Sequence, residues 1–206
     1  MPELELSDDL ELADTEITDA DHSGASLERA ELVRCRFVGV RLAGARFGSA
    51  RLVDVEFTRC DLAGADLSEV TVQRLRADDC RFTGAELPQA SLRSATFADC
   101  RFEDANLRLA RLHDVRFEQC ALAGADLNSA ILEDVVFTGS DCAGADFTHV
   151  QARSVDLRTA RLQGVRGIAS LRGATIGREQ VVPIALDLAL ALGLVVTDEE
   201  PPDRGQ

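Results

Sequence analysis

The sequence predicts an all-β solenoid: a right-handed quadrilateral β-helix of about eight coils, each with four five-residue steps, followed by a C-terminal α-helix. Three observations predict this fold. Leu, Ile, Val or Phe recurs at nearly every fifth residue from Leu12 to Leu162. The residues two positions earlier are small or apolar, and no Asp, Glu or Arg occupies either set. A period of 20 residues lies over the first period, so four steps close one coil.

Neither regular secondary structure explains a period of five. In an α-helix five residues advance by about 500°, which would spread the apolar side chains around the whole cylinder. In a strand an odd step would place successive side chains on opposite faces. The backbone must therefore turn a corner at every step, with two residues pointing inward and three outward. Right-handed winding follows the general rule for parallel crossovers.

The period of 20 sorts residue types into columns. Gly recurs at positions 24, 44, 64, 84, 124, 144 and 164, where it suits corners that need a positive φ. Phe and Cys form inward columns that contain no His. We interpret them as core stacks in which thiols fill the space of alanine, rather than as a cofactor, metal or disulfide site. These core stacks are Phe37, Phe57, Phe97, Phe117 and Phe137, and Cys60, Cys80, Cys100 and Cys120.

The outward columns alternate in the sign of their charge over several coils. One column reads Asp21, Arg41, Asp61 and Arg81. Opposite charges about 5 Å apart attract modestly, whereas stacked like charges repel. We therefore expect ladder contacts between neighbouring coils along these columns.

The five-residue phase slips after Leu162, and the next apolar centre is Leu171. We assign residues 1–9 to a leader, 10–176 to the β-helix, 177–196 to a C-terminal helix and edge strand, and 197–206 to a disordered tail. Residues 178–193 predict the helix, because Ala and Leu dominate them and Gly193 occupies a position typical of a helix end. Pro183 is tolerable only near the first turn. Residues 194–196 predict the edge strand.

Apolar residues point in nearly all directions around this helix, so one face can cap the last coil while the rest needs another partner. A second copy related by a two-fold axis is the simplest partner. We therefore predict a homodimer joined through the C-terminal segment. The predicted interface consists of Val181, Val182, Ile184, Leu186, Leu188, Leu190, Leu192, Leu194 and Val196.

Composition excludes several classes of function. The net charge is −14 and every basic residue is Arg, which argues against binding to nucleic acid or to anionic membranes. No run of about 18 apolar residues predicts a membrane span, and the N-terminus lacks the features of a signal peptide. We expect a cytoplasmic protein with reduced thiols. Because the sequence shows no catalytic constellation and no Gly-rich phosphate loop, we expect neither enzymatic activity nor a cofactor.

The repeat resembles the pentapeptide repeat family, whose consensus is roughly A-(D/N)-L-x-x. The match covers about residues 10–176 and implies a right-handed quadrilateral β-helix. Residues 171–196 also resemble the C-terminal segment of the mycobacterial fluoroquinolone-resistance members, through Leu171, Gly173, Gln180 and Gly193. That resemblance implies an end-to-end dimer that mimics duplex DNA and occupies the DNA-binding saddle of DNA gyrase. The direct matches to the consensus are Ala65-Asp66-Leu67, Ala105-Asn106-Leu107, Ala125-Asp126-Leu127 and Ala145-Asp146-Phe147.

Charge placement indicates a candidate surface. Acids and Arg balance over residues 22–120, whereas residues 121–152 contain five acids and no Arg and precede an Arg-rich segment. The predicted function is a non-enzymatic protein-binding solenoid, a DNA mimic that binds DNA gyrase or another topoisomerase and modulates it or protects it from quinolones. The alternatives are a structural scaffold for an unrelated partner and a plain solvated surface. The candidate partner-binding residues are Asp114, Glu118, Asp126, Glu133, Asp134, Asp141 and Asp146.

Overall fold

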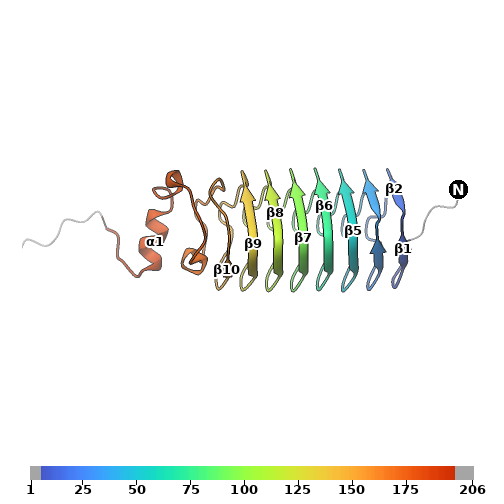
Figure 1. Cartoon of the computed structure of the whole chain (residues 1–206), viewed down its shortest axis with the longest axis horizontal. Coiled ribbons are helices and arrows are strands. Elements are labelled where there is room, and N and C mark those ends of the chain that lie inside the picture. Colours follow the sequence, from blue (N-terminus) through green and yellow to red (C-terminus); the bar gives the residue numbers. More distant parts are fainter. Residues whose placement is uncertain (1–5, 198–206) are drawn as a thin grey trace, which may run out of the picture.

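The computed structural model describes residues 6–197. It shows a parallel right-handed β-solenoid of about seven turns with one short helix at its C-terminal end (Figure 1). The sheet runs β1-β3-β5-β6-β7-β8-β9-β10, with β2 and β4 paired beside it. The elements are β1 (Glu11–Ala13), β2 (Glu16–Thr18), β3 (Glu31–Val33), β4 (Arg36–Val38), β5 (Arg51–Thr58), β6 (Thr71–Asp78), β7 (Ser91–Ala98), β8 (Arg111–Glu118), β9 (Ile131–Thr138), β10 (Gln151–Arg153), the 3-10 helices η1 (Ile168–Leu171) and η2 (Arg178–Gln180), and α1 (Ala185–Ala191).

The register of the sheet confirms the period of 20. Leu112 pairs with Leu132, and Phe117 pairs with Phe137. Within the regular turns each residue therefore lies beside its equivalent in the neighbouring turn, at the usual strand spacing of about 4.8 Å. This register determines which outward side chains can meet.

Each turn has four faces, which we number in chain order. Strands β5 to β9 each cover faces 3 and 4, whereas faces 1 and 2 are short turns joined to their neighbours by isolated bridges. On face 1, the Ala45 N–H donates to the Leu42 oxygen at 3.0 Å, and Gly44 has φ +64°. A positive φ at that position defines a type II turn. The inward residues are Leu42, Leu62, Phe82, Phe102, Leu122 and Cys142 on face 1; Phe47, Leu67, Leu87, Leu107, Leu127 and Phe147 on face 2; Leu52, Val72, Leu92, Leu112 and Leu132 on face 3; and Phe57, Ala77, Phe97, Phe117 and Phe137 on face 4.

Left-handed corners are more frequent than the glycine column predicts. The expected glycines, such as Gly44 and Gly64, do have positive φ. However, a residue with positive φ ends nearly every five-residue step, and most of these residues are not Gly; Asp54 and Ser49 have φ +55° and +56°. Asp is among the residues best tolerated in this region, and the hydrogen bonds between turns hold the remaining corners in place.

The core is a set of stacked columns, as predicted. Phe117 stacks on Phe97 and on Phe137, with ring centroids 5.3 and 5.1 Å apart. A second Phe column, which the sequence analysis did not identify, contains Phe82 and Phe102, stacked at 4.6 Å. Rings of the two columns meet edge to face. The six Cys residues are buried within the core and are free thiols in the structure.

The solenoid becomes irregular where the sequence loses one residue of phase. Asp156 bridges to Thr175, only 19 positions later, instead of 20. Gly167 has φ +71° and leads into η1, which buries Ile168 and Leu171. Ile176, which continues the new phase in sequence, is 36% exposed. The last turn is therefore incomplete on the side where the chain leaves the solenoid.

The predicted helix over 178–193 is shorter than expected. Only Ala185–Ala191 is α-helical, preceded by η2 and turns. Pro183 explains the late start, because proline disfavours helical geometry in the residue before it. The helix ends in a Schellman motif at Gly193: its N–H donates to Leu190, and the Leu194 N–H donates to Ala189. Residues 194–196, predicted as an edge strand at the contact with a second copy, form no strand within the single chain.

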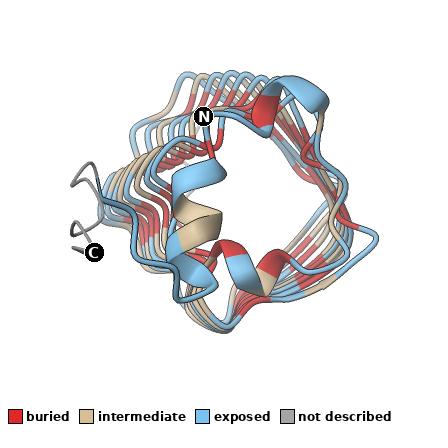
Figure 2. Cartoon of the chain, turned by 90° about the vertical axis from the view of Figure 1, so that its left-hand side faces the viewer, coloured by how far each residue is buried: buried red, intermediate tan, exposed pale blue. Residues whose placement is uncertain are grey.

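Helix α1 lies across the C-terminal end of the solenoid (Figure 2). Ile184, predicted at the dimer interface, is only 1% exposed, and Leu188 packs against the core, so both residues cap the chain's own last turn. Buried Gln180 fixes this cap by donating to the Leu157 and Ala160 oxygens at 2.6 and 2.5 Å. No helix within residues 6–197 has the length and apolar character that a bilayer span requires.

Candidate interaction surfaces

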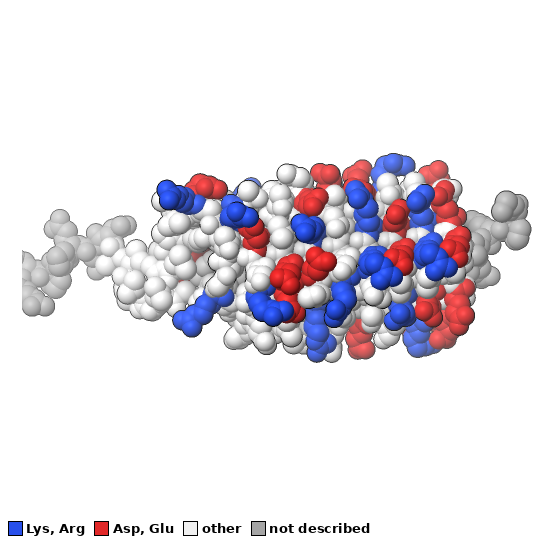
Figure 3. All heavy atoms as spheres, in the orientation of Figure 1, with Lys and Arg blue, Asp and Glu red and all other residues white. Residues whose placement is uncertain are grey.

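The predicted charge ladders are present along the outward columns. Arg29 Nη2 lies 2.8 Å from Asp9 Oδ2, and Arg36 lies between Glu16 and Glu56 at 3.3 and 3.0 Å. Blue and red side chains accordingly lie next to one another over much of the solenoid in Figure 3. Such exposed pairs contribute little individually, but each one joins two turns. Further pairs 20 residues apart are Arg34–Asp14, Arg41–Asp21, Arg51–Glu31, Arg74–Asp54 and Arg81–Asp61.

These contacts lower the pKa of several exposed carboxyl groups. The hydrogen bond from Arg29 holds the pKa of Asp9 below its ordinary value. Hydrogen bonds from the side chain and backbone of Ser23, together with Arg41, lower the pKa of Asp21 to about 2. The ladders are therefore most favourable when the carboxylates are ionised.

The seven predicted partner-binding residues do not share one surface. Twenty consecutive residues circle the solenoid once, so a segment such as 121–152 forms a ring rather than a face. Asp141 lies on face 1, Asp126 and Asp146 lie on face 2, and Glu118 lies on face 4. The remaining three, on face 3, are Asp114, Glu133 and Asp134.

Four of these seven residues are ion-paired with arginines from outside the segment. Asp114 accepts a hydrogen bond from Ser94 Oγ at 3.0 Å. Asp114, Glu118 and Asp134 have no ion pair within the described part of the chain. The acidic belt is therefore not an Arg-free surface, because the turns before and after it supply the cations. The pairs are Asp126–Arg108 at 3.2 Å, Asp141–Arg161 at 3.3 Å, Asp146–Arg166 at 3.3 Å, and Glu133 with both Arg153 and His113.

A different acidic surface, which the sequence analysis missed, runs along the edge between faces 1 and 2. Its face 2 column places Asp66 beside Glu86 and Asp126 beside Asp146, so like charges stack at the distance between turns. Reading every twentieth residue from Ser26 would have revealed this column in the sequence. We call the surface the acidic ridge; it consists of Asp66, Glu86, Glu103, Asp104, Asp126 and Asp146.

Most partners of the acidic ridge are neutral. Asp66 accepts hydrogen bonds from the backbone and hydroxyl of Ser68, and Glu86 accepts one from Asn106 Nδ2 at 2.5 Å. Within residues 6–197, Arg108 and Arg166 are the cations that pair with the ridge, one on Asp126 and one on Asp146. The ridge thus keeps most of its negative charge, unlike the alternating columns.

The grooves of the solenoid offer no evident chemistry. The groove between faces 3 and 4 near the N-terminal end has a volume of about 440 Å³, and its walls include the pairs Arg34–Asp14 and Arg36–Glu56. Among residues 6–197, no group of three or more His, Cys, Asp and Glu side chains is placed to hold a metal ion. The hydrogen bond with Cys120 and burial raise the pKa of Cys100 to about 12, which makes the thiol a poor nucleophile.

The sequence matches two models of one family. The model described as pentapeptide repeat region matches residues 73–147, and the model described as pentapeptide repeats (8 copies) matches 11–48, 35–74 and 130–166. Together they cover most of the chain, so the protein belongs to the pentapeptide repeat family. No curated protein matches the sequence.

Solved structures with a similar fold come from several sources. A trypsin-treated form of QnrB1, a plasmid-mediated fluoroquinolone resistance protein, is 23% identical, with 91% of this chain and 98% of that chain covered and a TM-score of 0.49. HetL from the cyanobacterium Nostoc is 20% identical, with 81% and 86% covered and a TM-score of 0.22. A pentapeptide repeat protein from the Arabidopsis thaliana thylakoid lumen is 27% identical, with 66% and 70% covered and a TM-score of 0.29. These similarities concern the fold.

The charge ladders predict an acid-sensitive solenoid. Because the folded-state pKa of Asp9 and Asp21 lies below the ordinary 3.8, their stabilisation is complete above about pH 4 and is lost as the pH falls toward about 2. The melting temperature at low salt should fall over this window, and Asp14→Asn with Asp54→Asn should reduce the slope. An identical slope in this variant would contradict the assignment of the slope to the ladders.

Proposed function

We propose that the protein is a non-enzymatic DNA mimic that binds DNA gyrase or another topoisomerase through the acidic ridge, and thereby modulates the enzyme or protects it from quinolones. The fold alone does not select this role. Proteins of this fold include a fluoroquinolone resistance protein and a protein involved in heterocyst differentiation regulation. The proposal therefore depends on the surface.

The observation that carries the proposal is the stacking of like charges on face 2. Several other outward columns place Arg beside Asp or Glu, which is the favourable arrangement, although like charges also stack at Glu11–Glu31 and Arg81–Arg101. The ridge instead places Asp66 beside Glu86 and Asp126 beside Asp146. Such stacking destabilises a sheet, so the stability of the fold does not account for it. A cationic partner does account for it.

The ridge is as long as a short stretch of a nucleic-acid strand, although its charges are more widely spaced. Four steps of about 4.8 Å separate Asp66 from Asp146, a length of about 19 Å. Phosphates along one DNA strand are spaced by about 3.4 Å. A column of carboxylates of this length, interrupted only by Asn106, can occupy a basic groove that otherwise binds phosphates, and it would compete directly with DNA.

Removing charge from the acidic ridge should abolish an effect on gyrase. We expect the wild-type protein to inhibit DNA supercoiling, or to reduce quinolone-stabilised cleavage, at micromolar concentration. The variant Asp66→Asn, Glu86→Gln, Glu103→Gln and Asp126→Asn should need at least about tenfold more protein, since several charge-assisted contacts are lost.

A matched control removes the same number of charges elsewhere. Asp79, Asp99, Asp114 and Asp134 have no ion pair within residues 6–197, and all four have a positive φ, which Asn tolerates. Their replacement by Asn should change activity only a few-fold. Equal losses in the two variants would show that net charge acts rather than the ridge. A wild-type protein without any effect on gyrase would contradict the proposal.

We further propose that two copies join through their C-terminal ends. The side of α1 that faces away from the solenoid leaves Leu186 and Leu190 53% and 56% exposed, and Leu194 extends the same apolar surface. This end of the molecule is largely white in Figure 3, which indicates few charges. A second copy about a two-fold axis would cover it and would place two acidic ridges on one long rod.

The dimer predicts a clear change in mass. Light scattering should give twice the chain mass for the wild-type protein and a single chain mass for Leu186→Ser with Leu190→Ser. Both residues point away from the core, so circular dichroism and the cap formed by Ile184 should persist. A monomeric wild-type protein at micromolar concentration would contradict the proposal.

A further inference from the structure

A small apolar surface, unlike the acidic ridge, lies at the edge between faces 2 and 3. Leu109 is 50% exposed and Ile131 is 36% exposed. Among the described residues that precede Ile176, they are the two large apolar side chains with such exposure. All other Leu, Ile and Phe residues of the regular turns face the core, so these two depart from the pattern of the solenoid.

The two side chains belong to adjoining turns at the same corner. The Leu109 N–H donates to the Asn128 oxygen at 3.0 Å, and Ile131 pairs with Arg111 in the sheet. Leu109 and Arg111 lie on either side of the buried corner residue Ala110. The register therefore places Leu109 and Ile131 in adjoining turns, on either side of the same corner.

Leu109 is unfavourable for the isolated chain in two ways. Its backbone has φ +60°, and it is the one apolar side chain among the non-glycine residues with positive φ in the described chain. Equivalent corners in other turns carry polar residues, for example Gln89 and Ser129. The left-handed conformation costs a leucine conformational energy, and at half exposure the side chain gains little from burial. Residues that cost stability in this way occur mainly at functional sites.

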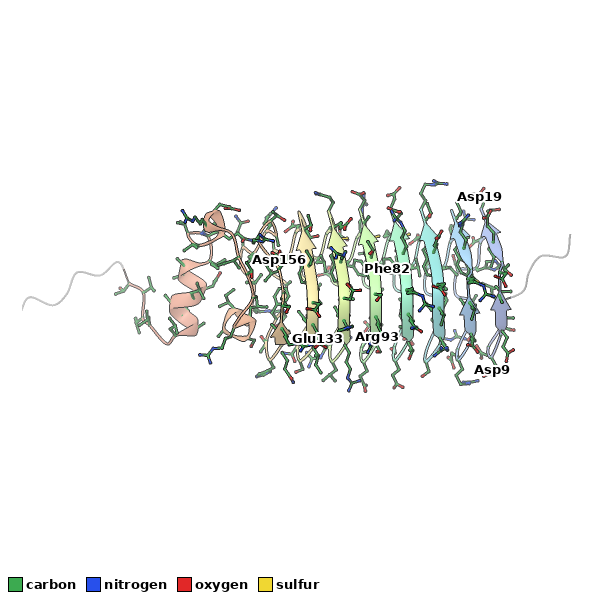
Figure 4. The ribbon with its side chains drawn as sticks, viewed as in Figure 1. Asp9, Asp19, Phe82, Arg93, Glu133 and Asp156 are labelled. Carbon is green, nitrogen blue, oxygen red and sulfur yellow. The ribbon has the colours of Figure 1, made fainter. Side chains whose placement is uncertain are left out.

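Two arginines without ion pairs lie on face 3, one beside Ile131 and one a strand further away. Arg93 in β7 and Arg111 in β8 project from neighbouring strands on face 3, and no carboxylate within residues 6–197 pairs with either. Figure 4 shows Arg93 on the same side of the solenoid as Glu133. Apolar anchors combined with Arg are typical of the centre of protein–protein interfaces.

We propose that Arg93, Leu109, Arg111 and Ile131 form a docking site for a protein segment that presents one large apolar side chain flanked by carboxylates. Leu109 and Ile131 contact the apolar side chain of the partner, and the guanidinium groups of Arg93 and Arg111 bind its carboxylates. This site lies on a different edge from the acidic ridge and has the opposite charge, so it does not depend on the role proposed for the ridge.

Nuclear magnetic resonance of the full-length protein tests this proposal with a defined probe. The probe is a capped peptide with one central tryptophan flanked by glutamates, and a second peptide carries lysines in place of the glutamates. We expect saturable shifts confined to the backbone amides around residues 91–93, 109–111 and 131–133, and none with the lysine peptide.

Two substitutions separate binding from folding. Leu109→Asn should weaken binding at least about tenfold while raising the melting temperature, because Asn tolerates a positive φ. Arg111→Ser, which introduces the residue that Ser91 provides in the same column, should also weaken binding. Val136→Thr on face 4, matched by Thr96, should bind like the wild-type protein. Absent shifts, shifts spread over all faces, equal binding of the lysine peptide, or unchanged binding by Leu109→Asn would each overturn the proposal.

Discussion

The structure depends on one constraint: each residue stacks on the residue 20 positions later, about one strand spacing away. Inward side chains therefore need a neighbour of similar shape on which they can stack. Outward side chains need a neighbour of opposite charge or no charge. The Phe rings satisfy the first requirement by stacking along the axis. The charge ladders satisfy the second by alternating Arg with Asp or Glu.

Residues that are unfavourable in the isolated solenoid then indicate surfaces that a partner covers. Asp66 beside Glu86 stacks two like charges, and Leu109 combines a positive φ with an exposed apolar side chain. Both departures lie within the regular part of the solenoid, where the register leaves no doubt about the neighbours. A partner that covers these residues would offset the unfavourable contacts. The ridge and the corner at Leu109 thus follow from the same reasoning, applied to charge in one case and to apolar exposure in the other.

The inward pattern made the solenoid predictable from sequence. Two inward residues in every five define the corner spacing, and the 20-residue columns define the turn, so Phe117 and Cys100 were placed in the core correctly. The arrangement of charges on the outward surface was harder to predict from the sequence. A count of charges along consecutive residues, as in 121–152, does not describe a surface, because a surface collects residues that are 20 apart. That is why Asp126 and Asp146 were expected to be free of Arg, whereas Arg108 and Arg166 contact them.

The C-terminal end shows a second limit of prediction from the sequence. Composition indicated a helix over 178–193, but Pro183 delays its start, and the capping role of Ile184 depends on how the chain crosses the last turn. Gln180 fixes this crossing through carbonyl groups about 20 residues earlier. A periodicity of apolar residues does not reveal which side of a short helix meets its own chain and which side stays exposed.

Carbodiimide labelling of carboxylates, read by mass spectrometry with and without gyrase, tests the central claim most directly. If a face of the solenoid binds the enzyme, protection should recur at Asp66, Glu86, Glu103 and Asp126, which lie in different turns. Asp134, which lies on another face, should remain labelled. Protection of a continuous segment around the solenoid, such as residues 121–152, or the absence of any protection, would contradict the account.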